Sequence, residues 1–380
     1  MKVILNYPHI GIFILAWFVA DLLIPLLIRV GSRFDILDRP GGHKGQKIPV
    51  PFFGGLGIFV AFTVSLCSTL RFSDVESFTP FMGLLLGGAM MVALGLIDDV
   101  RPINALVKLT AIFVATILLA SFGIHLNLFP PILYNSLNIA VTMIWISGVT
   151  SAMNSLDNTD GVAGGTSAIA ALFTFLIAWG HGPADAQPWL SYLAVSLAGA
   201  SIGFLRYNFA PARIYLGDNG AFFLGYALAT MLVFGHYSTD PVKAILVPCL
   251  ILCVPLYDIT LATLLRWRDG DVKSLRDAVL FCGRDHLAHL LLGLNLSKRQ
   301  TACAIYGLGI AGGLVGMLVL NVDPVAIYLP IVGIFVALLG ATGVVLGRVR
   351  KDVLAGVTPT SPRAHPFTRS VKRTVRRLTP

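Results

Sequence analysis

The fold class follows from residues 80–101, which read PFMGLLLGGAMMVALGLIDDVR. Residues 80–97 contain no charged side chain, and about 20 apolar residues are enough for a helix to cross a bilayer. The adjacent pair Asp98 and Asp99 marks the point where the apolar run ends. We expect a membrane-spanning helix that carries two carboxylates at its end.

Further apolar stretches of similar length occur along the whole chain. We therefore expect an all-α, polytopic integral membrane protein with about eleven transmembrane helices. The expected helices cover residues 10–30, 52–70, 80–97, 105–122, 132–149, 163–180, 189–207, 220–236, 242–265, 301–320 and 324–346.

The amino-acid composition excludes an ordinary water-soluble domain. Of the 380 residues, 56% are hydrophobic and 12% are charged, whereas soluble domains contain about 25% charged residues. The 28 Lys and Arg residues against 19 Asp and Glu residues give a net charge of +9. In a soluble protein this charge would suggest nucleic acid as a partner, but here we expect it to set the orientation in the membrane. We expect membrane lipids as partners and no nucleic acid.

Basic residues are distributed unevenly between the connections. If the N-terminus is outside, 25 of the 28 Lys and Arg residues lie in or beside cytoplasmic connections, and Lys2, Arg71 and Lys243 are the exceptions. Cytoplasmic loops carry such an excess, so we expect the N-terminus outside and the C-terminus in the cytoplasm. Residues 1–346 are expected to form the transmembrane domain. Residues 347–380, with nine basic residues and one acidic residue, are expected to form a flexible cytoplasmic tail.

Several carboxylates lie at the expected cytoplasmic ends of the helices. Asp98 and Asp99 are adjacent at a membrane boundary, where two negative charges repel one another and lose hydration, so a counter-cation is favoured. A Mg²⁺ ion or a role in phosphoryl transfer would explain the pair, and an ordinary helix end would explain it as well. Asp218 lies between two glycines at a helix start, where it is either a functional carboxylate or an N-cap.

Two other connections contain polar residues at helical spacing. Asn154, Asp157 and Asp160 recur every three residues and would share one face of a helical turn. His286 and His289 have the same spacing and could contact a metal ion, a phosphate or neighbouring carboxylates.

The first cytoplasmic connection, from Asp38 to Gly55, reads DRPGGHKGQKIPVPFFGG. Pro and Gly at this density exclude a helix and favour a shaped loop with exposed amides. Lys44 and Lys47 can neutralise phosphate oxygens in such a loop. A basic linker between two helices would have a similar composition.

Taken in order, these motifs resemble those of the polyprenyl-phosphate N-acetylhexosamine-1-phosphate transferase family. The family includes phospho-N-acetylmuramoyl-pentapeptide transferase and the UDP-N-acetylglucosamine:undecaprenyl-phosphate transferases. The resemblance extends from about Asp38 to His289. Where many members have Arg-Lys-x-His in the first loop, this chain has His-Lys-Gly-Gln, and the middle histidine of His-x-His-His is absent. These differences favour the transferases that begin polysaccharide assembly.

The resemblance implies transfer of a sugar 1-phosphate from a UDP-sugar to polyprenyl (undecaprenyl) phosphate, with release of UMP. N-acetylglucosamine 1-phosphate is the first expectation, and another UDP-N-acetylhexosamine is the alternative donor. The resemblance also implies Mg²⁺ as the cofactor, with Mn²⁺ as an alternative, and an active site on the cytoplasmic face of the inner (plasma) membrane. A homodimer is left open.

The resemblance assigns roles to individual residues as well. By analogy, Asp98, Asp99 and Asp218 are expected to be catalytic residues and metal ligands, with Asp218 as the first candidate ligand. Substrate binding is expected from Lys44, Lys47, Asn154, Asp157, Asp160, His286 and His289.

Three other classes of membrane protein compete with this interpretation. A secondary transporter would place its charges near the midplane and show two related halves, whereas these acids lie at one face. A CDP-alcohol phosphotransferase would continue Asp-Gly-x-x-Ala-Arg, but Gly164 and Gly165 follow Asp160 and Gly161 at those positions. A scaffold without enzymatic activity has no physical reason to concentrate Asp beside glycine turns.

Overall fold

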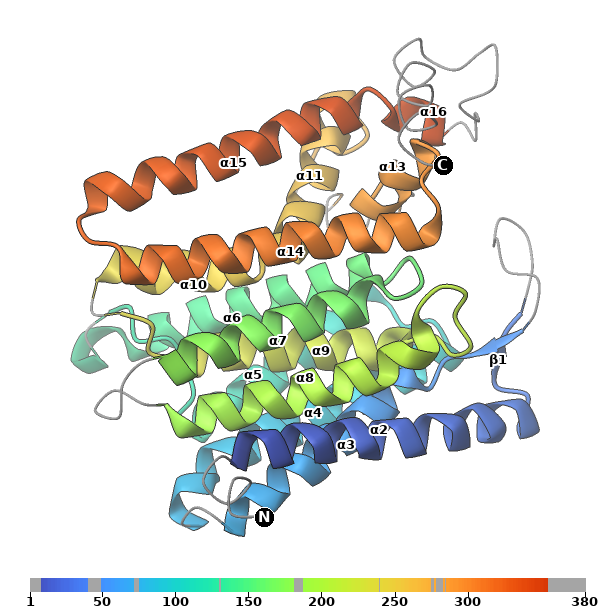
Figure 1. The fold of residues 1–380 in the computed structure, drawn as a ribbon, viewed down its shortest axis with the longest axis horizontal. Helices are drawn as coiled ribbons and strands as arrows, with labels where there is room; N and C mark the ends of the chain where they lie inside the picture. Colours follow the sequence, from blue (N-terminus) through green and yellow to red (C-terminus); the bar gives the residue numbers. More distant parts are fainter. Residues whose placement is uncertain are drawn as a thin grey trace.

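The computed structural model describes residues 8–39, 49–71, 75–129, 131–180, 187–238, 240–274, 277, 283 and 285–354. These residues form a bundle of helices, most of which run along a common axis (Figure 1). The helices are α2 (Pro8–Arg33), α3 (Gly54–Cys67), the 3₁₀ turn η1 (Ser68–Arg71), α4 (Val75–Val100), α5 (Ala105–Ser121), α6 (Pro131–Leu156), α7 (Val162–Gly180), α8 (Pro188–Asn208), α9 (Gly217–Phe234), α10 (Pro241–Ile251), α11 (Cys253–Asp269), α13 (Leu287–Gly293), α14 (Lys298–Asn321), α15 (Val325–Gly347) and α16 (Arg350–Leu354).

Local sequence signals set several helix ends. The side chain of Asn104 accepts a hydrogen bond from the backbone N–H of Leu106 at 2.9 Å and so caps α5. Ser297 and Gln300 form a capping box at the start of α14. Gly270 ends α11 in the left-handed conformation, with φ at 79°. The short strands β1 (Leu37–Asp38) and β2 (Val50–Pro51) pair as an antiparallel ribbon beside the bundle.

The expectation of an all-α membrane fold agrees with the described helices, but the number of eleven spans is not confirmed. Seven described helices are long and apolar enough to cross a membrane, and the bent pair α10 and α11 makes an eighth if it forms one span. The two members of that pair meet at 81°. The remaining expected spans are the shorter helices α3 and α5, and α9, whose first turn is polar.

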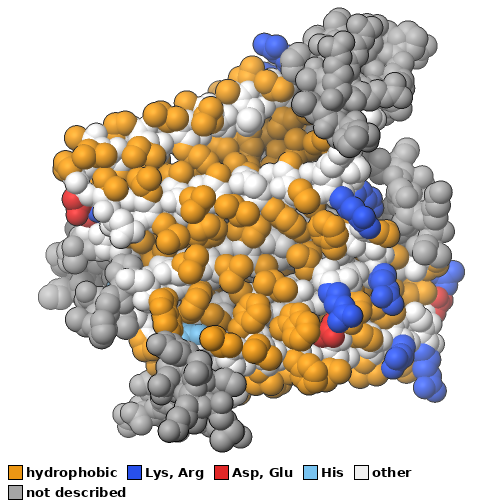
Figure 2. Space-filling view, in the orientation of Figure 1, with side chains coloured by type: hydrophobic (Ala, Val, Ile, Leu, Met, Phe, Trp, Pro, Cys, Tyr) orange, Lys and Arg blue, Asp and Glu red, His pale blue; other side chains and the backbone are white. Residues whose placement is uncertain are grey.

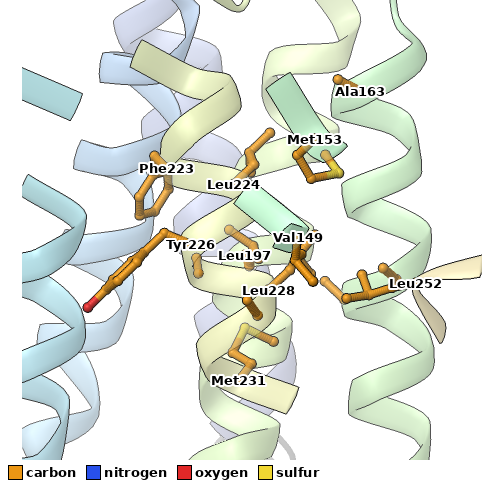
Figure 3. Close-up of a cluster of buried hydrophobic side chains, with 14 of the residues drawn as sticks. Val149, Met153, Ala163, Leu197, Phe223, Leu224, Tyr226, Leu228, Met231 and Leu252 are labelled. Atoms are coloured by element: carbon orange, nitrogen blue, oxygen red, sulfur yellow. The ribbon is translucent and has the colours of Figure 1, made fainter. Parts of the chain in front are cut away.

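Helix α9 lies in the interior of the bundle. It packs against α3, α4, α6, α7 and α8, and its residues 219–232 are all buried. In Figure 3, its Leu224 and Leu228 lie beside Val149 and Met153 of α6. The hydroxyl of Tyr226 donates towards two backbone carbonyl groups of α4 and α5, at 3.4 and 3.3 Å. A helix that is apolar on all sides is surrounded either by protein or by lipid, and these contacts show that α9 is surrounded by protein.

The outer surface is apolar between its two ends (Figure 2). Helix α15 illustrates this, because only 17% of the residues in its 18-residue apolar segment are buried. Its Ile334, Leu338 and Val344 are exposed. Lys and Arg side chains gather towards the end that holds the start of α14 (Figure 2). This distribution is typical of a protein whose middle faces hydrocarbon and whose end faces the headgroups.

One charge within a span has a structural partner. Asp21 of α2 accepts hydrogen bonds from Nη1 of Arg206 in α8 at 2.8 and 2.9 Å, one at each carboxylate oxygen. The hydroxyl of Tyr207 donates to the same carboxylate at 3.0 Å. The pairing offsets the cost of a carboxylate inside the membrane, so Asp21 joins α2 to α8.

Connections that are far apart in the sequence meet at one end of the molecule (Figure 1). The backbone N–H of Tyr215 donates to the carbonyl of Pro51 at 2.8 Å, and the N–H groups of Gly54 and Gly55 donate to the carbonyls of Tyr215 and Leu216, both at 3.0 Å. These bonds join the segment before α3 to the segment before α9. The connections that the sequence assigns to the cytoplasmic side thus lie together, while the orientation itself stays a prediction.

The fold continues beyond the expected domain boundary at residue 346. Residues 350–354 form α16, and the side chain of Arg350 is only 1% exposed. The first part of the expected flexible tail is therefore helical and packed against the protein. Residues 355–380 lie outside the described residues.

Candidate functional site

A carboxylate from α4 holds the start of α9. Gly217 has φ at +74°, and a Cβ there would lie 2.5 Å from the carbonyl oxygen of Phe52 and 2.8 Å from Oδ2 of Asp99, so only glycine fits. The backbone N–H groups of Asp218 and Asn219 donate to Oδ1 and Oδ2 of Asp99, at 2.9 and 3.3 Å. Asp99 therefore caps α9, where a negative charge is favoured by the free amides and the helix dipole.

The side chain of Asn219 ties a third helix to this junction. Its Nδ2 donates to Oδ2 of Asp99 and to the carbonyl of Phe52, both at 2.7 Å. Its Oδ1 accepts a hydrogen bond from the first turn of α3 at 2.9 Å. A Cβ on Gly55 would lie 2.0 Å from Cα of Gly220, so the backbones of α3 and α9 touch. These contacts fix the ends of α3, α4 and α9 relative to one another.

Asp98 is buried next to this junction, with 5% of the residue exposed. Its Oδ1 accepts a hydrogen bond from the N–H of Ile103 at 2.7 Å, and its Oδ2 forms an ion pair with Lys108 of α5. The carboxyl groups of Asp98 and Asp218 also interact directly. The structure thus brings Asp98, Asp99 and Asp218 together at the ends of α4 and α9.

Asp157 directly follows α6 and adds a fourth carboxylate. Burial raises the pKa of Asp157 to about 8, and the nearby charges of Asp99 and Asp160 act in the same direction. Within the described part of the chain, its carboxylate has no hydrogen-bond partner. A cation placed beside it would favour the charged form. Asn154, one turn earlier in α6, is partly exposed.

Asp160 is engaged in holding the loops together. Its Oδ1 accepts from Nζ of Lys298 at 2.9 Å, and its Oδ2 accepts from the N–H of Ala212 at 3.2 Å. The next residue, Gly161, donates its N–H to Oδ1 of Asn208 at 2.9 Å and accepts the hydroxyl of Tyr306 at 2.6 Å. The loop after α6 is therefore fastened to α8 and α14.

A second charged group surrounds His286, at the start of α13. Its Nδ1 lies 2.9 Å from Oδ2 of Asp258, and its Nε2 lies 3.1 Å from Nη2 of Arg266. Because a guanidinium group can only donate, Nε2 accepts from Arg266 and Nδ1 carries the proton towards Asp258. The imidazole is thereby held from both sides. His289 lies in α13 and is partly exposed.

The carboxylates at this end of the bundle differ in whether they are available to bind a metal ion. Among the described residues, no group of three or more His, Cys, Asp or Glu side chains could hold a metal ion unaided. Asp99 has both oxygens engaged at α9, and Asp98 is paired with Lys108. In contrast, Asp157 and Asp218 have no ion-pair partner among the described residues. Mg²⁺ in phosphate-handling sites commonly uses one or two carboxylates, together with waters and substrate phosphates, and the carboxylates of Asp157 and Asp218 are available as such ligands.

The remaining expected site residues are distributed differently. Lys44 and Lys47 lie outside the described residues. Asp160 is tied to Lys298, and His286 belongs to the separate group around Arg266.

Sequence reasoning missed three residues that contact the site. Lys108 was detectable, because it is a single cation in an otherwise apolar stretch at 105–122. Asn219 stands next to Asp218, but nothing local indicates that its side chain reaches α3 and α4. Lys298 is separated from Asp160 by 138 positions, so no local pattern predicts their contact.

The sequence profile described as "Glycosyl transferase family 4" matches residues 81–236. This segment includes most of α4 and continues through α9, so it contains the helix ends that carry Asp98, Asp99 and Asp218.

Three relatives show how far the similarity extends. A Bacillus subtilis protein named "Probable undecaprenyl-phosphate N-acetylglucosaminyl 1-phosphate transferase" is 27% identical over 371 residues, which cover 96% of each chain. A Mycobacterium tuberculosis protein named "Decaprenyl-phosphate N-acetylglucosaminephosphotransferase" is 30% identical over 305 residues, 73% of this chain and 74% of the relative. A Clostridium botulinum protein named "Phospho-N-acetylmuramoyl-pentapeptide-transferase" is 27% identical over 236 residues, 58% of this chain and 70% of the relative.

Gly217 and Gly270 provide a matched test of the junction. Both have positive φ, but a Cβ on Gly270 meets nothing within 4 Å, whereas one on Gly217 meets Phe52 and Asp99. Gly270→Ala should cost about 1–2 kcal/mol, the usual penalty of the left-handed conformation. Gly217→Ala should cost several kcal/mol more, because the cap on α9 must open as well. Thermal unfolding in detergent measures the difference in stability between the two variants. Equal losses of stability would contradict the close contact of Gly217 with Phe52 and Asp99.

Proposed function

Because the chain belongs to glycosyl transferase family 4, we propose that it transfers N-acetylglucosamine 1-phosphate from UDP-N-acetylglucosamine to a polyprenyl phosphate such as undecaprenyl phosphate. UMP is the leaving product, and the lipid then carries the sugar through a diphosphate. Such a reaction is the first membrane step of cell-envelope polysaccharide assembly. The name of the Clostridium botulinum relative refers to a different sugar, N-acetylmuramoyl-pentapeptide. Another UDP-N-acetylhexosamine is therefore the alternative donor.

The observation that carries this proposal is the meeting of Asp98, Asp99, Asp157 and Asp218 at one end of an apolar bundle. Both proposed substrates are polyanions, so catalysis of phosphoryl transfer relies on positioning and on neutralising charge. Carboxylates without basic partners provide for this by binding a cation. Their position at a bundle end suits a reaction between a membrane-anchored phosphate and a water-soluble nucleotide sugar.

We propose that Asp218 and Asp157 are the main ligands of Mg²⁺, with Mn²⁺ as an alternative. The bound ion would supply charge neutralisation on the phosphate oxygens. Other carboxylates are proposed to position the metal ligands. Asp99 holds the start of α9, and thereby Asp218, in place through its hydrogen bonds to the α9 amides.

Asp98 is proposed to act through electrostatics and alignment. Its ion pair with Lys108 and its contact with Asp218 hold the charge next to the proposed metal ligand. Removal of a proton from the lipid phosphate demands little, since a phosphate monoester has a second pKa of about 6 and is largely ionised at neutral pH.

The residues around this centre are proposed to bind the donor. Lys44 and Lys47 are proposed partners of the diphosphate, where their ammonium groups would act as point charges. Asn154, His286 and His289 are proposed to contact the nucleotide or the sugar. The reaction is proposed to take place on the cytoplasmic face of the plasma membrane, where the basic residues are expected.

Formation of radiolabelled lipid from polyprenyl phosphate tests the function directly. Purified protein is incubated with Mg²⁺ and a panel of UDP-sugars, and UMP release is measured in parallel. We expect labelled lipid and equimolar UMP with UDP-N-acetylglucosamine. Well-folded protein that releases no UMP with any sugar would overturn the transferase proposal.

Asp218→Asn should lower the rate by about 10²–10³-fold, because one strong electrostatic contact in the transition state is lost. It should also raise the Mg²⁺ concentration that gives half of the maximal rate. Asp240→Asn is the matched control, because Asp240 caps α10 at the opposite end of the bundle and should leave the rate unchanged. A variant at position 218 with the wild-type rate and Mg²⁺ dependence would remove Asp218 from the proposed metal site.

Asp98→Asn distinguishes alignment from proton removal. If Asp98 aligns the site, the substitution should lower kcat by about 10–100-fold and leave the shape of the pH–rate profile unchanged. The reason is that the acceptor phosphate is already ionised above its second pKa of about 6. Rates measured across the neutral and alkaline range decide between the two roles. Steep recovery of the variant at high pH would support a base role for Asp98 instead.

A further inference from the structure

Arg350 is a buried arginine in a segment that the sequence assigns to a flexible tail. It begins α16, just after α15, and 1% of the residue is exposed. Arginine almost never becomes fully buried without partners, because an unpaired charge in a low-dielectric interior is very costly. The position of Arg350 therefore indicates a specific set of acceptors.

The acceptors are three carboxylates, one from the last residue of α11 and two from the connection between α11 and α13. Nη1 of Arg350 donates to Oδ2 of Asp269 at 2.6 Å, and Nη2 donates to Oδ2 of Asp271 at 2.7 Å. Nη2 and Nε both donate to Oδ2 of Asp285, at 2.8 and 3.1 Å. A planar fork of five N–H donors is suited to such a multiple contact, whereas a lysine is not.

The contact continues from Asp285 towards His286, which is proposed to bind the donor. Asp285 is completely buried, and it also accepts from Nε and Nη2 of Arg266, at 2.9 and 2.7 Å. The same Nη2 of Arg266 faces Nε2 of His286 at 3.1 Å. Burial alone would raise the pKa of Asp285, but the hydrogen bonds from Arg266 and Arg350 outweigh it and hold the pKa below its usual range. Asp285 is thus a charged bridge between the two arginines.

Backbone packing accompanies these ion pairs. A Cβ on Gly293 of α13 would lie 2.2 Å from Val353 of α16, so the two short helices are in close contact. Figure 1 shows α13 and α16 side by side near the end of α15. Nη2 of Arg268 also donates to the carbonyl of Gly347 at 3.2 Å. The end of α11, α13 and α16 therefore form one packed unit.

We propose that Arg350 is a positioning residue of the transferase: through Asp285 and Arg266 it holds the imidazole of His286 in its place. The segment after α15 is then part of the functional protein and not an appendage to it. Without Arg350, Asp269, Asp271 and Asp285 would lose the cation that they share, whereas the ion pairs of Asp285 with Arg266 and of Asp269 with Arg268 would remain. Repulsion between the three carboxylates would then move the segment that carries His286. The inference rests on the proposed function, because it assigns His286 to the transferase site.

The experiment compares Arg350→Ala with Lys351→Ala, which removes an exposed positive charge from the next position of the same helix. Hydrogen–deuterium exchange of α13 reports the order of the segment without using activity. We expect exchange in α13 to become at least tenfold faster in Arg350→Ala, with kcat at least tenfold lower and KM for the UDP-sugar changed less. Lys351→Ala should match the wild type in both measurements.

Two further variants separate positioning from general stability. Arg350→Lys keeps the charge and should give intermediate values of exchange and kcat, which covers the case that Arg350→Ala does not fold. In a His286→Gln background, Arg350→Lys should lower kcat no further, because effects that act through one residue are not additive. Additive losses would show that Arg350 acts elsewhere and would overturn the proposal.

The exchange measurement separates failure of the positioning role of Arg350 from failure of the proposed transferase function. A wild-type protein that releases no UMP overturns the transferase proposal, and exchange in α13 still tests whether Arg350 orders that helix. Unchanged exchange in Arg350→Ala would overturn the positioning role. Faster exchange with unchanged kcat would overturn it too, since Arg350 would then only anchor α16.

Discussion

The contact between the carboxylate of Asp99 and the first turn of α9 determines the geometry of the candidate site. Asp99 accepts from two backbone N–H groups of α9 and from the side chain of Asn219. These are donors that a helix start leaves without partners inside the helix. Further along the two helices, α4 and α9 meet through apolar side chains and the hydrogen bond of Tyr226 to the carbonyl of Gly83, so the contact of Asp99 sets their register at the site. It places Asp98 and Asp218 so that their carboxyl groups interact.

The carboxylates of the site fall into two groups according to their partners. Asp98 is paired with Lys108, and Asp160 is paired with Lys298, so these charges are balanced within the protein. Asp157 and Asp218 have no such partner among the described residues. In a region with little water, unbalanced carboxylates favour a bound cation or a proton. The proposed division between structural and metal-binding carboxylates follows from this difference.

The all-α membrane fold was predictable because long apolar stretches have few stable alternatives in a bilayer. The number of eleven spans stays a prediction, because length and composition do not distinguish a helix that faces lipid from one that is surrounded by protein, as α9 is. The meeting of Asp98, Asp99 and Asp218 was predictable from their position at helix ends on one side. The role of Arg350 was not, because its acceptor Asp269 lies 81 positions away and nine basic residues share the segment. The roles of Lys44 and Lys47 stay predictions, because both residues lie outside the described part of the chain.

The interior position of α9 has a consequence for how the protein is made. The helices that pack against it most extensively are α3, α4, α6, α7 and α8, and all of them precede α9 in the chain. When α9 leaves the ribosome, the walls of its binding site have already been synthesised. Its polar first turn, with Asp218 and Asn219, can then meet Asp99 and α3 without first being exposed to lipid. The order of synthesis therefore lets the polar first turn of α9 find its partners as the helix is inserted.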